Sequence, residues 1–214
     1  MLSLLIESTI DTLIMVFFST FFSLFFGLPL AVFLYGTQKK SLFPKPTLNK
    51  IVGSIVNVVR SFPFIILIVV LLPFSRLIVG TSIGVQAAIV SLSIAAIPFM
   101  ARLFESALNE IDKGLIEATI SMGASKFTVI KMILKEMLPA LINVTTIAII
   151  SITGYSAMAG ALGAGGLGDL AIRVGFQSNQ PDILLATIIV IIVFVQIIQS
   201  LGDFLSGYLK RKRG

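Results

Sequence analysis

The sequence contains no cysteine, no histidine and no tryptophan, and it is poor in charged residues. Without cysteine the chain cannot form a disulfide or use a thiol nucleophile, and without histidine it cannot form a catalytic triad that needs an imidazole base. Charged residues make up 12% of the chain, whereas roughly 25% is typical of soluble domains. These absences exclude many catalytic and zinc-binding arrangements and indicate that the surroundings of this chain are a lipid bilayer.

Motifs for nucleotides and for serine nucleophiles are also missing or incomplete. No G-x-x-x-x-G-K-[ST] occurs, so the chain does not bind ATP through a P-loop of its own. GAGGLG at 163–168 satisfies G-x-G-x-x-G, but an apolar helical run precedes it where a dinucleotide fold needs a strand. GYSAM at 154–158 begins like a nucleophile elbow but ends in methionine. We therefore expect a protein that is not an enzyme by itself, with no catalytic residue, metal or cofactor.

Long apolar runs dominate what is present, with 57% hydrophobic residues and a mean hydropathy of +1.06. A helix needs about 20 mostly apolar residues to cross a bilayer. Five segments meet this requirement: 12–35, 51–72, 84–104, 140–158 and 183–205. No lysine or arginine precedes the first of them, unlike in a secretory leader, so we expect it to be retained. The prediction is an all-α polytopic membrane protein with five transmembrane helices, forming a single domain over residues 1–214.

The distribution of lysine and arginine predicts the orientation, because cytoplasmic loops of membrane proteins are enriched in both. With five spans, three basic segments fall on one side: Lys39, Lys40, Lys45 and Lys50; Lys113, Lys126, Lys131 and Lys135; and Lys210, Arg211, Lys212 and Arg213. The opposite side carries only Arg76 and Arg173. We expect the N-terminus outside and the C-terminus in the cytoplasm, with the lipid bilayer rather than nucleic acid as the partner of this basic chain.

Helix-breaking residues lie within three of the predicted spans, at Gly27 and Pro29, at Pro63 and at Pro98. Such residues are tolerated in membrane helices where neighbouring groups satisfy the freed backbone. They indicate either ordinary packing kinks or broken helices beside a substrate path.

The insert between the third and fourth spans, residues 105–139, is too polar to cross a membrane, yet its apolar residues recur with helical spacing. Gly123 is suited to end one helix in the left-handed conformation, and Ser125 is suited to cap the start of the next. The first helix would carry its apolar face on Leu115, Ile116, Thr119, Ile120 and Met122, and the second on Phe127, Ile130, Ile133, Leu134 and Met137. The prediction is two helices hinged at Gly123 on the cytoplasmic surface, where an interfacial amphipathic hairpin is the alternative.

The stretch Glu117-Ala118-Thr119, followed by Gly123, resembles the EAA loop in the permease subunits of ABC importers. In that family the loop forms a coupling helix that docks into a groove of a separate cytoplasmic ATPase. The resemblance implies that Glu117, Ala118, Thr119, Gly123, Ala124 and Ser125 make this contact. Lys135-Glu136 replace the Leu-Pro of the family pattern, and Leu138-Pro139 follow later, which affects the entry of the chain into the fourth span.

Four further segments resemble the methionine-uptake permeases of bacterial ABC transporters: RSFPFIIL (60–67), LLPFSRLIVGTSIGVQAAIV (71–90), GLIEA (114–118) and GYSAMAGALGAGGLGDL (154–170). The resemblance implies a type I importer permease in the bacterial plasma membrane that works as a homodimer. It also implies two ATPase subunits, which alone bind ATP and magnesium, and an extracellular substrate-binding lipoprotein.

Candidates for the translocation path or gate are Arg60, Tyr155, Ser156, Ala157 and Met158. An arginine at mid-bilayer costs about 2.5–3.5 kcal/mol on insertion scales, so Arg60 either faces a partner or a wet cavity, or extends to the membrane surface. The residues from 155 to 158 either line a gate near the outer end of the fourth span or serve ordinary helix packing.

The expected function is the translocation subunit of an ATP-driven importer for methionine, with D-methionine and methionine-containing dipeptides as further substrates. One alternative is a permease for another amino acid. The other is a stand-alone secondary transporter or channel, which usually carries intramembrane acidic residues. Acidic residues of this chain lie in loops or near the ends of the spans, which disfavours that second alternative.

Overall fold

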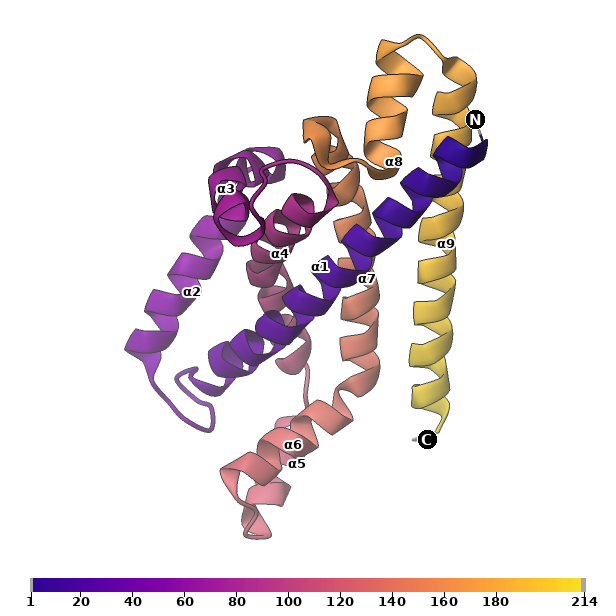
Figure 1. Cartoon of the computed structure of the whole chain (residues 1–214). Coiled ribbons are helices and arrows are strands. Elements are labelled where there is room, and N and C mark those ends of the chain that lie inside the picture. Colours follow the sequence, from indigo (N-terminus) through magenta and orange to yellow (C-terminus); the bar gives the residue numbers. More distant parts are fainter. Residues whose placement is uncertain (1, 213–214) are drawn as a thin grey trace.

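The computed structural model describes residues 2–212, and its regular elements within that range are all helical. Most of the chain belongs to long helices joined by short connections (Figure 1). In chain order the elements are α1 (Leu2–Gly36), α2 (Pro46–Ser61), α3 (Phe64–Val79), α4 (Val85–Leu108), α5 (Lys113–Ser121), α6 (Lys126–Glu136), α7 (Leu138–Ala159), η1 (Gly160–Ala164), α8 (Gly166–Asp169), η2 (Leu170–Gln177) and α9 (Pro181–Arg211).

Four of the long helical stretches are apolar enough to cross a membrane: α1, α4, α7 continued by η1, and α9. They coincide with the predicted spans 12–35, 84–104, 140–158 and 183–205 and extend beyond them at one or both ends. The predicted insert 105–139 is shorter in the structure, because α4 continues to Leu108 and α7 already begins at Leu138. The helices α4 and α7 thus extend beyond the apolar segments from which their spans were predicted.

The predicted span 51–72 differs most from expectation, because it is not one helix. It consists of α2 and α3, which meet at an angle of 106° and are long and apolar enough to cross a membrane only when taken together. Phe62, just before Pro63, has the extended conformation that a following proline favours. Pro29 and Pro98, in contrast, lie inside the continuous helices α1 and α4. Of the prolines in the predicted spans, Pro63 therefore breaks a span.

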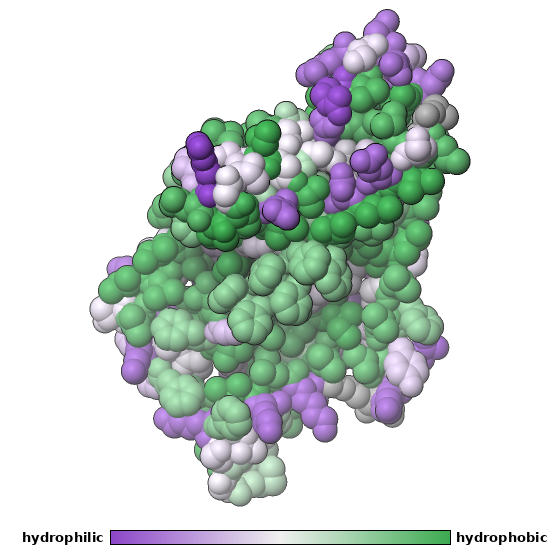
Figure 2. Space-filling model, in the orientation of Figure 1, coloured by the Kyte–Doolittle hydropathy of each residue, from purple (hydrophilic) through white to green (hydrophobic). Residues whose placement is uncertain are grey.

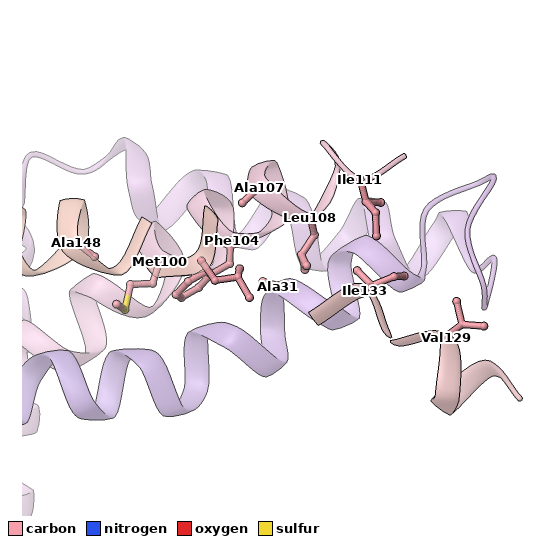
Figure 3. Packing of buried hydrophobic residues seen from close by; sticks show 10 residues of the cluster. Ala31, Met100, Phe104, Ala107, Leu108, Ile111, Val129, Ile133 and Ala148 are labelled. Carbon is pink, nitrogen blue, oxygen red and sulfur yellow. The ribbon is translucent and has the colours of Figure 1, made fainter. Parts of the chain in front are cut away.

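The centre of the molecule is α4, the most buried of the spans, which packs against α1, α3 and α7. The largest cluster of buried apolar side chains follows α4 toward the hairpin formed by α5 and α6 (Figure 3). Its members are Ala31, Met100, Phe104, Ala107, Leu108, Ile111, Val129, Ile133, Leu141 and Ala148. Because Val129 and Ile133 belong to α6, the hairpin is anchored in the same core as the membrane helices.

The outer surface is apolar over the middle of the molecule and hydrophilic toward the two ends (Figure 2). On α1 this surface includes a row of exposed phenylalanines: Phe17, Phe18, Phe21, Phe22, Phe25 and Phe26. Only 11% of the most apolar stretch of α9 is buried within the chain. Such extensive apolar surface is stable in contact with lipid or with other membrane subunits.

The three basic segments lie at one end of the molecule. In Figure 1 the α5–α6 hairpin, the end of α9 and the connection from α1 to α2 all lie toward the bottom. The turn between η2 and α9 lies at the top, as does the N-terminal end of α1. Arg213, counted above with the basic tail, lies outside the described residues. This arrangement has the polarity that the distribution of lysine and arginine predicts.

Candidate functional site

The predicted helix–bend–helix is present, and short-range contacts define it. Gly123 has a φ of 81°, and its N–H donates to the carbonyl of Ile120 over 2.9 Å. This left-handed conformation carries little cost for glycine. Ser125 caps α6, because its Oγ accepts a hydrogen bond from the N–H of Thr128 at 3.2 Å. Asp112 caps α5 through the N–H of Gly114 at 2.8 Å, a cap that the sequence analysis did not identify.

The apolar face predicted for residues 115–122 is divided in the structure. Thr119 is buried and Ile116 packs against the core cluster. Leu115, Ile120 and Met122 are exposed instead, with Met122 at 80% exposure. The prediction of one face was wrong because a two-turn helix between the core and the solvent places apolar residues on both sides. The side of α5 that packs against the core and the side of α5 that is free to bind another protein are therefore different.

Of the coupling residues inferred from the EAA resemblance, Glu117, Ala118, Gly123 and Ser125 are exposed, Ala124 is half-buried and Thr119 is buried. The exposed ones of these residues, together with the exposed apolar residues Met122 and Phe127, make up the tip and outer side of the hairpin. Exposed apolar groups surrounded by polar ones are typical of a protein interface. The hairpin surface is therefore suited to bind a partner.

A cavity of about 640 Å³ lies between this hairpin and the connection that follows α1. Glu117 and Ile120 line it from α5, and Lys40, Lys113 and Lys126 also contribute to its lining. The ammonium group of Lys126 lies 4.8 Å from the ring centroid of Phe43, which links the start of α6 to the α1–α2 connection. The cavity combines one carboxylate with several cations, so it can complement a partner surface of mixed charge.

An ion pair at the end of α4 was not identified from the sequence. Arg102 donates to Glu105 across 2.6 Å and to the carbonyl of Gly53 in α2 across 2.7 Å. Gln38, in the α1–α2 connection, donates to the other oxygen of Glu105 at 3.2 Å. An arginine in an apolar run with a glutamate three positions later was the signal available in the sequence. These bonds join three segments next to the start of the hairpin.

The proposed path residues are brought together only in part. Tyr155 stacks on Phe64 of α3, with 3.7 Å between ring centroids, and meets the edge of Phe99 of α4 at 6.3 Å. Arg60 lies exposed in the last turn of α2, just before the break at Pro63 that leads to Phe64. No local sequence pattern indicates that Phe64 and Phe99 contact Tyr155, because both are distant from it along the chain.

The other three candidates have different surroundings. Ser156 is buried and its Oγ donates to the carbonyl of Thr153 in its own helix at 2.8 Å. Ala157 packs closely against Gly168. Met158 is 45% exposed. Ser156 and Ala157 therefore contribute to packing within α7 and against α8, whereas Tyr155 and Met158 present side chains that a path could use.

The glycine-rich segment folds back onto α1. Gly163, Gly165 and Gly166 all have positive φ values, between 74° and 88°. The N–H of Leu167 then donates to Oγ1 of Thr12 in α1 at 2.8 Å. The positive φ values and this packing against a membrane helix account for the glycines at 163, 165 and 166.

Known proteins resemble this chain over most of its length. A family model described as "binding-protein-dependent transport system inner membrane component" matches residues 24–214. A probable D-methionine transport system permease protein of Vibrio cholerae is 49% identical over 94% of this chain and 90% of its own length. The methionine import system permease protein of Bacillus subtilis is 44% identical over 84% of this chain and 81% of its own length.

Two solved structures share the fold. A chain of the MetNI methionine ABC transporter in an inward-facing conformation superposes with a TM-score of 0.96 at 44% identity, covering 98% of this chain and 97% of that one. A chain of an amino acid ABC transporter with histidines superposes with a TM-score of 0.73 at 18% identity, over 98% of this chain and 94% of that one. At that lower identity the second likeness concerns the fold alone.

Proposed function

The chain belongs to the family of binding-protein-dependent transport system inner membrane components, and on that premise we propose how it works in a methionine importer. It is the permease subunit of that importer, a multi-pass component of the inner membrane, and a separate subunit supplies the ATPase. The observation that carries this function is the match of nearly the whole chain, in sequence and in fold, to the MetNI methionine transporter. This match favours a methionine permease over the two alternatives that the sequence left open, which are a permease for another amino acid and a stand-alone carrier or channel.

The α5–α6 hairpin is the contact with the ATPase in this proposal. The exposed side chains of Ile120, Met122 and Phe127 enter an apolar groove of the ATPase, and Glu117 pairs with cations on its surface. The buried side of the hairpin supports this role, because Val129 and Ile133 connect it to the core around α4. A movement imposed on the hairpin by closure of the ATPase would therefore reach the membrane helices through packed side chains.

The remaining partners follow from the same proposal. A second copy of the chain covers part of the exposed apolar surface, two ATPase subunits bind at the hairpin ends, and ATP and magnesium bind only to them. An extracellular lipoprotein delivers the substrate to the opposite end. The clustering of the basic segments at the hairpin end supports an orientation with the N-terminus outside and the C-terminus in the cytoplasm. The likeness to an inward-facing transporter supports the same state for this chain.

The path for methionine runs past the outer part of α7, where Tyr155 and Met158 provide an aromatic face and a thioether. Aromatic and thioether groups form favourable contacts with the sulfur-containing side chain of methionine. Relatives named for D-methionine support the D-enantiomer as a second substrate, and methionine-containing dipeptides are a further candidate.

The experiment is to purify the chain together with its ATPase and binding protein and to reconstitute them in proteoliposomes. We expect the ATPase to co-purify and ATP turnover to rise with external methionine but not with leucine. Turnover that does not respond to methionine, or an ATPase that does not co-purify, would contradict the proposed function.

A further inference from the structure

The strongest unexplained contact lies between α2 and α4, and we name Gly53, Arg102 and Glu105 the α2–α4 clamp. The guanidinium of Arg102 bridges the two helices, with one nitrogen 2.6 Å from the Glu105 carboxylate and another 2.7 Å from the Gly53 carbonyl. The side chains of Arg102 and Glu105 are only 22% and 10% exposed. Arginine is suited to such a bridge because its planar fork can donate to two acceptors at once, which the single ammonium of lysine does not reproduce.

Gly53 makes this approach possible. A Cβ atom built on Gly53 would lie 2.9 Å from Nη2 of Arg102, closer than real Cβ contacts occur. Since any larger residue would displace the guanidinium, the clamp depends on both helices, with the arginine on one and the missing side chain on the other. Gly53 can therefore be changed to test the contact without altering any charge.

The clamp holds α2 at Gly53, near the middle of that helix, and adjoins the hairpin through the end of α4. Asn109, in the connection that leads to α5, donates to the backbone carbonyl of Glu105 at 2.8 Å. The α1–α2 connection joins through Gln38, whose amide donates to the Glu105 carboxylate. A movement of the hairpin can therefore act, through the end of α4, on the residues that hold the middle of α2.

The C-terminal end of α2 leads to the region around Tyr155 that is proposed for the path. After α2 the chain bends at Phe62 and Pro63 into α3, where Phe64 stacks on Tyr155. Figure 1 shows α2 rising from the hairpin end of the molecule toward α3. The second half of α2 thus lies between the clamp at Gly53 and the bend that leads to the aromatic stack.

We propose that Arg102 is a positioning residue, which transmits movement of the coupling hairpin through the α2–α4 clamp to α2 and so to the stack of Phe64 on Tyr155. The proposal rests on the function proposed above. The Nε of Arg102 is buried and has no hydrogen-bond partner among the described residues. A buried donor without an acceptor destabilises the arrangement that contains it, so the hydrogen bonds of the clamp are not all satisfied in this state.

The test compares variants of the permease in the complete reconstituted complex. Arg102→Lys keeps the charge and removes the bridge, whereas Gly53→Ala displaces the guanidinium from the other helix. Both are expected to lower the methionine imported per ATP hydrolysed by roughly tenfold, within the range of ordinary coupling between sites. Co-purification of the ATPase and ATP turnover without methionine should remain as in the wild type.

The matched control is Arg173→Lys, because Arg173 and Asp169 form an ion pair of the same 2.6 Å length in η2 and α8, away from the hairpin. We expect its import per ATP to equal that of the wild type. An unchanged ratio in both clamp variants would overturn the proposal, as would a loss of ATPase co-purification in proportion to the loss of import. If the wild-type complex itself shows no methionine-dependent turnover, the proposed function fails first and this inference fails with it.

Discussion

The coupling hairpin and the region around Tyr155 lie toward opposite ends of the molecule and are built in different ways. The hairpin is defined by neighbours in the sequence: Asp112 and Ser125 cap its helices, and Gly123 turns the chain between them. Tyr155 depends on rings contributed by two other helices. The difference teaches that the hairpin, the proposed contact with the ATPase, is locally encoded, whereas the region proposed for the path is assembled by packing between helices.

The largest effect is expected from Gly123→Pro, which disrupts the local design of the hairpin. Proline holds φ near −65° and has no N–H, whereas Gly123 has a φ of 81° and donates to Ile120. The local cost of about 3 kcal/mol or more should displace α5 from α6 and reduce methionine-stimulated ATP turnover at least tenfold. Gly123→Asn is the control, because asparagine tolerates the left-handed conformation. Normal turnover in Gly123→Pro with intact membrane insertion would show that the hinge is not needed for coupling.

A smaller effect is expected from Glu117→Lys, which leaves the backbone of the hairpin intact. Reversing an exposed charge at an interface weakens association mainly at low salt. We expect the dissociation constant of the ATPase to rise about tenfold at low salt and the difference to shrink as salt is added. Glu110→Lys makes the same charge change in the α4–α5 connection and should have a weaker effect. Equal effects of the two variants would mean that only net charge matters.

The outer end is tested by Tyr155→Ala, which removes the stack on Phe64. Aromatic pairs contribute about 0.5–1.5 kcal/mol beyond the area that they bury. Import per ATP should therefore fall roughly two- to tenfold, whereas binding of the ATPase should not change. Tyr155→Phe keeps the ring and should behave as the wild type. A loss of equal size in Tyr155→Phe would assign the role to the hydroxyl group instead of the stack.

The smallest effect is expected from Ser125→Ala, which removes one helix cap. Loss of an N-cap costs about 1 kcal/mol, so the amides in the first turn of α6 should exchange with deuterium about fivefold faster. Ser125→Asp should restore the slower exchange because aspartate is an equally good cap. Exchange that is unchanged in the alanine variant would indicate that core contacts of Val129 alone hold this turn.

The same contrast explains how much the sequence could predict. The hinge at Gly123, the cap at Ser125 and four apolar spans follow from neighbouring residues, and the structure contains all of them. Whether Pro63 would kink or break its span was not predictable, because Pro29 and Pro98 remain inside continuous helices. The broken helix depends on where Phe64 packs, and that partner is distant in the sequence.

Tertiary contacts also explain the residues whose surroundings were misjudged or overlooked. Thr119 shares a helical repeat with Ile120 and Met122 but is buried, since α5 packs against α6 on one side only. The bridge from Arg102 to Gly53 joins positions whose relation no local pattern reveals. Sequence patterns therefore identified the hairpin as a unit but not the side by which it is attached.

The central claim, that the hairpin is the contact with the ATPase, is tested most directly by site-specific photocrosslinking in the intact complex. A photoreactive benzoylphenylalanine is placed at Met122 on the hairpin, which is 80% exposed, or at Phe176 in η2, which is 73% exposed. The account predicts a crosslink from position 122 to the ATPase subunit and none from position 176. A crosslink from position 176, or the absence of one from position 122 in a complex that still hydrolyses ATP in response to methionine, would contradict it.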